Sequence, residues 1–121
     1  MDIMKTEVNG VNIAIVNSDE VVIKDVQTAL DLMATVQYEA ECDRIGIYKS
    51  LLSEQFFDLK TRLAGEILQK FTNYQVKVAI IGDFSTYPSQ SFKDFIYECN
   101  SGKAIFFLPT EQQAIEKLSM L

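Results

Sequence analysis

Hydrophobic and polar positions in the first 17 residues predict a β-hairpin. Residues 11–16 (VNIAIV) are rich in β-branched residues, which favour strands, and residues 4–8 (MKTEV) fit a second short strand. Asn9 and Gly10 lie between them, and both residue types tolerate a positive φ, which makes this pair a strong hairpin signal. We therefore expect the chain to open with a hairpin.

Apolar residues recur at helical spacing after the capping cluster of residues 17–19. The pattern predicts an amphipathic helix that ends near Ala40. Leu32 and Val36 fall outside its apolar arc, so we expect them either at the surface or on a surface that meets a partner. The expected buried face comprises Ile23, Val26, Leu30, Met33, Ala34 and Tyr38.

A longer helix is predicted from Ser53, a candidate N-cap, to about Thr72. A short strand at residues 43–48 (DRIGIY) precedes it. The apolar run at residues 76–81 (VKVAII) follows it and is typical of a central parallel strand covered on both faces. The buried stripe of the helix is expected to comprise Phe56, Leu59, Leu63, Ile67 and Phe71.

The last third of the chain predicts two more helices around a fifth strand. The first helix begins at Ser89 or Ser91 and stops at Gly102, its expected C′ residue. The strand is expected at residues 104–108 (AIFFL). A capping box that starts at Thr110 predicts the final helix. Its buried residues are expected to be Ala114, Leu118 and Leu121.

These elements predict an α/β fold in a single domain, residues 1–121, with the order β-β-α-β-α-β-α-β-α. We expect a mostly parallel five-stranded sheet with one antiparallel edge and helices packed on its faces. Each strand–helix–strand crossover should be right-handed.

Composition excludes several classes of function. The 121 residues fit one domain, and the net charge of −6 argues against binding nucleic acid, whose phosphates need clustered Lys and Arg. No stretch approaches the roughly 18 apolar residues of a membrane span, and the first residues do not resemble a signal peptide, so we expect a cytoplasmic protein without membrane contact. The sequence has no histidine, which excludes imidazole catalysis and imidazole metal ligands.

Catalytic motifs are missing from the sequence. It contains no G-x-S-x-G elbow, P-loop or GxGxxG motif, and we expect no catalytic residue, no metal and no cofactor. Cys42 and Cys99 are far apart and form no CxxC, so we expect two reduced, unlinked thiols.

Asp83 is the main candidate for a site residue because it follows the predicted central strand, at the edge of the sheet where α/β proteins bind ligands. Lys60 falls inside the apolar arc of the longer helix, and helical side chains lean toward the N-terminus, which here means toward the same edge. We predict that both approach one cavity that takes a small polar or anionic ligand. Two alternatives stay open: Asp83 caps its own turn, and Lys60 covers apolar neighbours with its stem. The remaining candidates are Ser50, Ser53 and Ser85 on the rim, Lys49 as a second cation, and Gly82 as the residue that lets the backbone turn.

Four segments carry a resemblance to a known family. They are residues 25–34 (DVQTALDLMA), 56–71 (FFDLKTRLAGEILQKF), 78–84 (VAIIGDF) and 94–100 (DFIYECN). Together they resemble the bacterial family called domain of unknown function 4180 over nearly the whole chain. That family implies no established activity, cofactor or catalytic residue. Arg62 departs from the small residue expected there, which argues against a family-wide role for its charge.

The order of strands and helices also looks like the STAS domain of anti-sigma-factor antagonists and sulfate transporters. STAS antagonists carry a phosphorylatable residue in an Asp-Ser-Gly-like setting, whereas residues 48–53 here read YKSLLS, so a phosphoswitch does not carry over. Two hypotheses follow. The first is a non-enzymatic regulatory or protein-interaction module that binds another protein or forms a homodimer. The alternative is a small-ligand-binding protein or weak enzyme.

Overall fold

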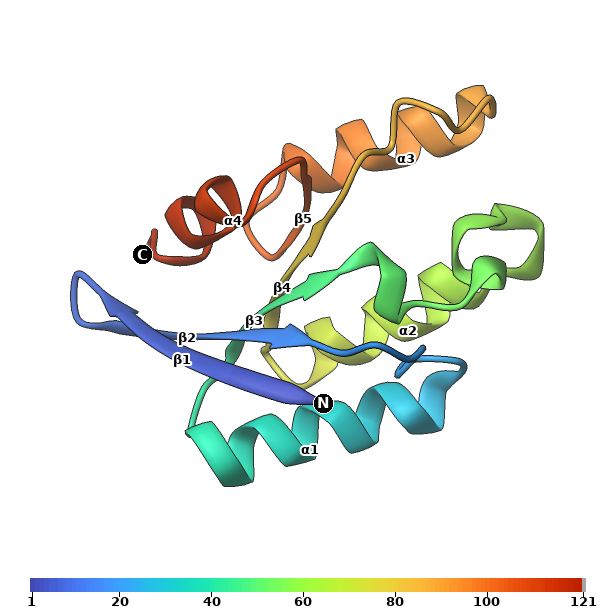
Figure 1. Ribbon diagram of the computed structural model, residues 1–121. Coiled ribbons are helices and arrows are strands. Elements are labelled where there is room, and N and C mark those ends of the chain that lie inside the picture. Colours follow the sequence, from blue (N-terminus) through green and yellow to red (C-terminus); the bar gives the residue numbers. More distant parts are fainter. Residues whose placement is uncertain (121) are drawn as a thin grey trace.

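The computed structural model describes residues 1–120 and confirms the α/β fold and the predicted order of strands and helices (Figure 1). The strands are β1 (Asp2–Val8), β2 (Val11–Asn17), β3 (Arg44–Tyr48), β4 (Lys77–Ile81) and β5 (Ile105–Leu108). The α-helices are α1 (Val26–Ala40), α2 (Leu63–Asn73), α3 (Gln90–Asn100) and α4 (Glu111–Leu118). Three short 3₁₀ turns are η1 (Lys49–Leu51), η2 (Glu54–Phe57) and η3 (Leu59–Thr61).

The strands form one sheet whose spatial order is the chain order, β1-β2-β3-β4-β5. Only β1 and β2 are antiparallel, and their two-residue turn has a positive φ at Asn9 (54°) and at Gly10 (79°), which is the geometry of a type I′ hairpin. The other neighbouring strands pair in parallel. The Asn-Gly signal therefore predicted the hairpin correctly.

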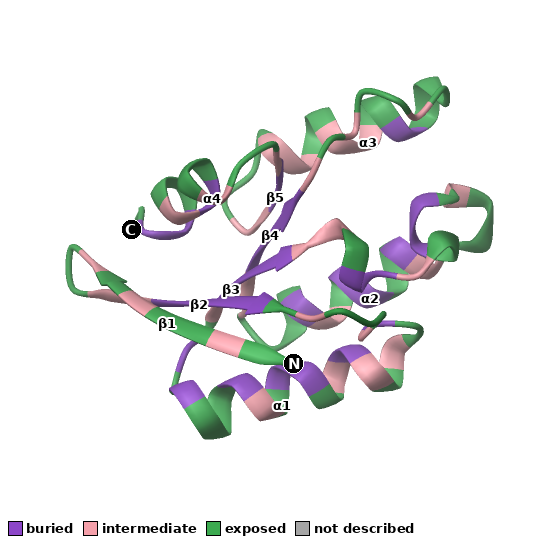
Figure 2. Cartoon of the chain, in the orientation of Figure 1, coloured by how far each residue is buried: buried purple, intermediate pink, exposed green. Residues whose placement is uncertain are grey.

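The strand order never reverses, so the three helices that connect parallel strands lie on one face of the sheet. Right-handed crossovers that all step in the same direction place α1, α2 and α3 on the same face of the sheet. Figure 2 shows the buried residues concentrated on the central strands and on the inner sides of the helices. The opposite face is covered by α4, and its core comprises Ile13, Ile15, Ala79, Ile81, Phe106, Ala114 and Leu118.

Both ends of α4 are bonded to β3. The guanidinium of Arg44 donates to the carbonyl oxygens of Leu118 (2.6 Å) and Met120 (2.9 Å), where the helix ends. At the start of the helix the Tyr48 hydroxyl donates to Glu111 Oε1 at 3.0 Å. Burial, and then the Glu111 carboxylate, raise the pKa of Tyr48. The helix therefore lies antiparallel to β3 and is fixed at two points.

The predicted long helix is wrong in its first half. α2 begins at Leu63, and residues 49–61 form the three 3₁₀ turns instead. The spacing Phe56–Leu59 matches the i, i+3 repeat of a 3₁₀ turn as well as it matches an α-helix, so periodicity does not separate the two. Arg62 adopts a left-handed conformation with φ of 63°, which breaks the helix between the turns and α2.

The expected buried face of the first helix also needs correction. Leu32 and Val36 are buried in α1, whereas Tyr38 is 89% exposed, because the buried face of the helix centres on the small residues Ala29 and Ala40. Two other expectations concern helix ends. α3 ends at Asn100 with Ser101 as its C-cap, so Gly102 occupies the predicted C′ position, although without the left-handed backbone common for a glycine there. The expected burial of Leu121 lies outside the described residues.

Cys42 and Cys99 are free thiols, as expected. Burial raises the pKa of both, that of Cys99 to about 11, so neither has the low pKa of a reactive cysteine. Within residues 1–120, no helix is both long enough and apolar enough to cross a membrane.

Candidate functional site

Lys49 and Asp83 meet at the carboxyl edge of the sheet, because they follow the neighbouring parallel strands β3 and β4. The Lys49 ammonium donates to the backbone carbonyl of Asp83 at 2.7 Å. The same Nζ lies 4.9 Å from the centroid of the Tyr87 ring and 5.7 Å from that of Phe84, within the range of cation–π attraction. Lys49 thus fastens the loop after β4 to the end of β3.

Gly82 is required by the close approach of Lys49. A Cβ added to Gly82 would lie 2.7 Å from Cδ, 2.9 Å from Cγ and 3.1 Å from Cβ of Lys49. The Lys49 Cβ is fixed to the backbone. Its Cγ and Cδ could move aside only by taking the ammonium away from the Asp83 carbonyl. Gly82 therefore makes room for the lysine stem instead of permitting an unusual turn.

The Asp83 carboxylate is exposed and bonded within its own loop. Its Oδ1 accepts from the Ser85 hydroxyl (2.6 Å) and from the Ser85 N–H (2.9 Å). These two hydrogen bonds, with a minor contribution from Lys49, hold the pKa of Asp83 below its usual value. The geometry is that of a side chain capping its own turn, which was one of the two interpretations of this residue.

Neither Lys60 nor Ser50 makes a side-chain hydrogen bond to Lys49 or Asp83 in the described part of the chain. Lys60 is exposed on η3, where its backbone N–H donates to Asp58 Oδ1 at 3.1 Å. No ion pair joins Lys60 to Asp83, although both belong to the described part of the chain. The prediction that Lys60 approaches Asp83 relied on the direction of a side chain in an α-helix. Lys60 lies in the 3₁₀ turn η3, so that reasoning does not apply to it. Ser50 is exposed on η1.

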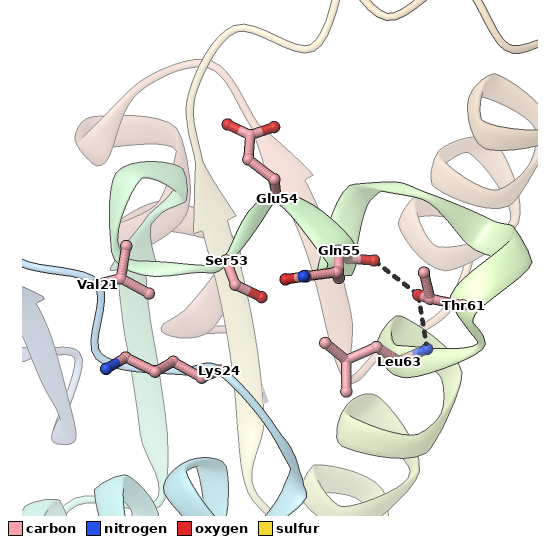
Figure 3. Close-up of a pocket in the computed structure, with 7 residues that line it drawn as sticks. All are labelled: Val21, Lys24, Ser53, Glu54, Gln55, Thr61 and Leu63. Carbon is pink, nitrogen blue, oxygen red and sulfur yellow. Dashed lines mark hydrogen bonds between the residues drawn. The ribbon is translucent and has the colours of Figure 1, made fainter.

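Ser53 lines a separate, open groove of about 760 Å³ between the chain segment before α1 and the start of α2 (Figure 3). Its Oγ is buried and has no hydrogen-bond partner among the described residues. In Figure 3 the Glu54 carboxylate points away from Ser53, and the Thr61 hydroxyl is bonded to Gln55 and Leu63. The full lining is Val21, Lys24, Ser53, Glu54, Gln55, Thr61 and Leu63. The sequence does not reveal this groove, because its pattern predicts a continuous helix over the 3₁₀ turns that shape it.

The two outer edges of the sheet differ. At the β5 edge the Asn100 side chain bonds both backbone groups of Phe107: its Oδ1 accepts from the N–H at 2.7 Å and its Nδ2 donates to the carbonyl at 3.1 Å. The amide thus occupies the place of a further strand. At the β1 edge no further described strand pairs with the seven-residue strand, which lies at the outside of the sheet in Figure 1.

The hairpin turn determines which groups of β1 face outward. A type I′ turn closes with a hydrogen bond between its flanking residues, here Val8 and Val11. Antiparallel pairs alternate between bonded and non-bonded, so every second residue before Val8 bonds to β2. The backbone groups of Ile3, Lys5 and Glu7 therefore point away from the sheet and are open to another strand.

No group of three or more His, Cys, Asp or Glu side chains within residues 1–120 could hold a metal ion. Three features of the described residues bear on function: the anchored loop at the carboxyl edge, the groove with a buried hydroxyl, and the outermost strand β1.

Comparison with known proteins places the chain in one family. No curated protein matches it, and no solved structure matches it. A family described as domain of unknown function (DUF4180) matches residues 8–118, nearly the full length. The chain therefore belongs to that family, the one indicated by the four segments in its sequence.

Proposed function

We propose that this protein is a non-enzymatic interaction module that binds another polypeptide chain along the open edge of β1. The observation that carries this proposal is the contrast between the two edges of the sheet. Free edges invite strand addition, and proteins commonly block them. Here the β5 edge is blocked by Asn100, whereas the β1 edge, with seven residues, is left open.

The carboxyl edge supports the non-enzymatic part of the proposal. The Lys49 ammonium is already bonded to the Asp83 carbonyl and covered by Tyr87, and the Asp83 carboxylate is already bonded to Ser85. A general acid or base must be able to reach a substrate proton. These charged groups hold a loop in place instead.

Strand addition also suits the surface of β1. Its outward backbone groups supply main-chain hydrogen bonds, and its side chains alternate between the two faces, which is how an added strand gains both affinity and specificity. Met4 is 51% exposed on this strand, although its partner Ile15 on β2 is almost fully buried. An added strand would cover Met4.

Site-specific photo-crosslinking in cells that make the protein naturally tests the proposal. A photoreactive residue at Met4 is expected to give one defined adduct, whose cross-linked peptide is identified by mass spectrometry. The same residue at Lys103, an exposed position before β5, is the matched control. In a Lys5→Pro background the adduct should disappear, because proline removes an outward N–H from an edge strand.

Two results would overturn the proposal. One is the lack of any adduct from Met4 in a chain whose melting temperature shows that it is folded. The other is an adduct that forms equally well from Lys103, or that survives Lys5→Pro.

A second candidate function is the binding of a small polar molecule in the groove of Figure 3. The buried, unpartnered Ser53 hydroxyl favours it, because such a group costs free energy until it finds a hydrogen bond. Lys24 also lines this groove. Titration with inorganic phosphate and with acetate, followed by NMR, should shift the amide signals of Ser53 and Leu63. Ser53→Ala should abolish the shifts, and Ser50→Ala, outside the groove, should not; unchanged spectra would exclude binding of these ions.

A further inference from the structure

We infer that the chain bound along β1 is a second copy of the same protein, with the two β1 strands antiparallel and crossing at Thr6. This inference rests on the proposed function, because it names the partner for the open edge. The two sheets would join into one continuous sheet around a two-fold axis, an arrangement in which the same patch serves both protomers.

The outward backbone groups limit which pairings are possible. Two β1 strands exchange hydrogen bonds only if outward residues lie opposite outward residues, which here means Ile3, Lys5 and Glu7. With a two-fold axis through Thr6, Lys5 of each protomer lies opposite Glu7 of the other. Two such pairs contribute about four backbone hydrogen bonds across the axis.

Charge selects this register over its neighbours. Moving the axis by one residue to Lys5 places two lysines opposite each other, and moving it to Glu7 places two glutamates opposite each other. Like charges directly opposite destabilise a sheet, and opposite charges stabilise it. Only the axis through Thr6 pairs each Lys5 with a Glu7, and both side chains are exposed and without an ion pair in the described chain.

The other face of the strand agrees with this register. Met4, Thr6 and Val8 share one face, because they pair with Ile15, Ile13 and Val11 on β2. In the dimer, Met4 lies opposite Val8 of the second copy and Thr6 lies opposite Thr6. The exposed Met4 side chain is then covered by an apolar residue, and threonines pair well across strands.

Sedimentation equilibrium of the purified chain, from micromolar to millimolar concentration, tests the pairing by charge exchange. The parent chain is expected to dimerise. Glu7→Lys and Lys5→Glu should each weaken the dimer at least about tenfold, because both pairs become repulsive. The double variant Lys5→Glu/Glu7→Lys keeps the net charge of the parent and should restore the dimer. Lys103→Glu controls for charge at a distant site.

Cysteine substitution tests the position of the axis. Facing residues of a non-bonded antiparallel pair have Cα atoms about 4.5 Å apart, within reach of a disulfide. Thr6→Cys should therefore form a covalent dimer under mild oxidation. Met4→Cys, which lies opposite Val8, should not, and the parent with its buried Cys42 and half-buried Cys99 is the baseline.

The outcomes separate the two proposals. A chain that stays monomeric at every concentration overturns the inference, and the Met4 photo-adduct with a different protein would then still support the proposed function. The register is overturned if Glu7→Lys leaves the dimer affinity unchanged. It is also overturned if Met4→Cys forms a disulfide-linked dimer and Thr6→Cys does not. Near-ultraviolet circular dichroism of each variant excludes misfolding as the cause.

Discussion

Single side chains determine how the carboxyl edge of the sheet is built. Lys49 contributes its ammonium to the Asp83 carbonyl and its stem to the space above Gly82. The sequence predicted Lys60 as the main partner of Asp83 and named Lys49 only as a second cation. It did not reveal that the contact joins an ammonium to a backbone carbonyl, since that depends on the path of the loop and not on the residue types.

Two glycine-to-alanine substitutions distinguish a required glycine from a replaceable one. We expect Gly82→Ala to lower the free energy of unfolding by about 1–3 kcal/mol, because the new methyl group overlaps the Lys49 stem. Gly65→Ala, on the exposed side of α2 with no atom within 4 Å of the added Cβ, should raise it by about 0.5–1 kcal/mol. Urea unfolding of both variants checks this, and equal shifts would contradict the assigned role of Gly82.

At the scale of elements, the reliable signals were those that act within a few residues. Asn9-Gly10 predicted the hairpin, and the N-cap half of the capping box predicted at Thr110 is present, because the Thr110 hydroxyl accepts from the Gln113 N–H at the start of α4. The start of α2 was missed because residues at i+3 fit both kinds of helix, and because the break depends on the backbone of Arg62. Turns and helix caps could thus be predicted from the sequence, whereas the choice between a 3₁₀ turn and an α-helix could not.

The N-terminus of α1 gives a pH-dependent prediction. Hydrogen bonds from the backbone and side chain of Thr28 hold the pKa of Asp25 below its ordinary value. A lowered folded-state pKa means that the carboxylate stabilises the fold at pH values above the unfolded pKa, and that this contribution is lost as the pH falls through the folded pKa.

Asp25→Ala should therefore lower the denaturation midpoint at pH 7, and the difference from the parent should vanish in strong acid. Asp19→Ala, in the exposed loop before α1, is the control and should change the midpoint little. A difference between Asp25→Ala and the parent that is constant from neutral to acid pH would show that the capping carboxylate is not responsible.

At the scale of the whole molecule, the open and blocked edges of the sheet were invisible in the sequence. Edge status depends on which strands end up outermost, and nothing in the sequence indicates that the Asn100 side chain bonds to β5. The same holds for the strand order: because it never reverses, the sheet has no point where adjacent crossovers diverge, which is the feature on which the expectation of a crevice beside Asp83 relied. Element order was predictable, and the use of each surface was not.

Opening the second edge is the corresponding test. Asn100→Ala leaves both backbone groups of Phe107 without their partner, so we expect a loss of about 1–3 kcal/mol in unfolding free energy and concentration-dependent light scattering. Asn100→Asp keeps the acceptor for the Phe107 N–H and should scatter less. If Asn100→Ala stays as soluble as the parent, the side chain does not protect the edge.

The position of α4 at the end of the chain affects how the protein folds during synthesis. A ribosome makes all five strands before it makes this eight-residue helix, which covers the second face of the sheet. During that interval Ile15, Ile81 and Phe106 have no helix above them, and nascent chains with exposed apolar strands attract chaperones and each other. A pause in synthesis after β5 would thus leave one apolar face of the sheet uncovered. α4 must pack on that face before another chain binds to it.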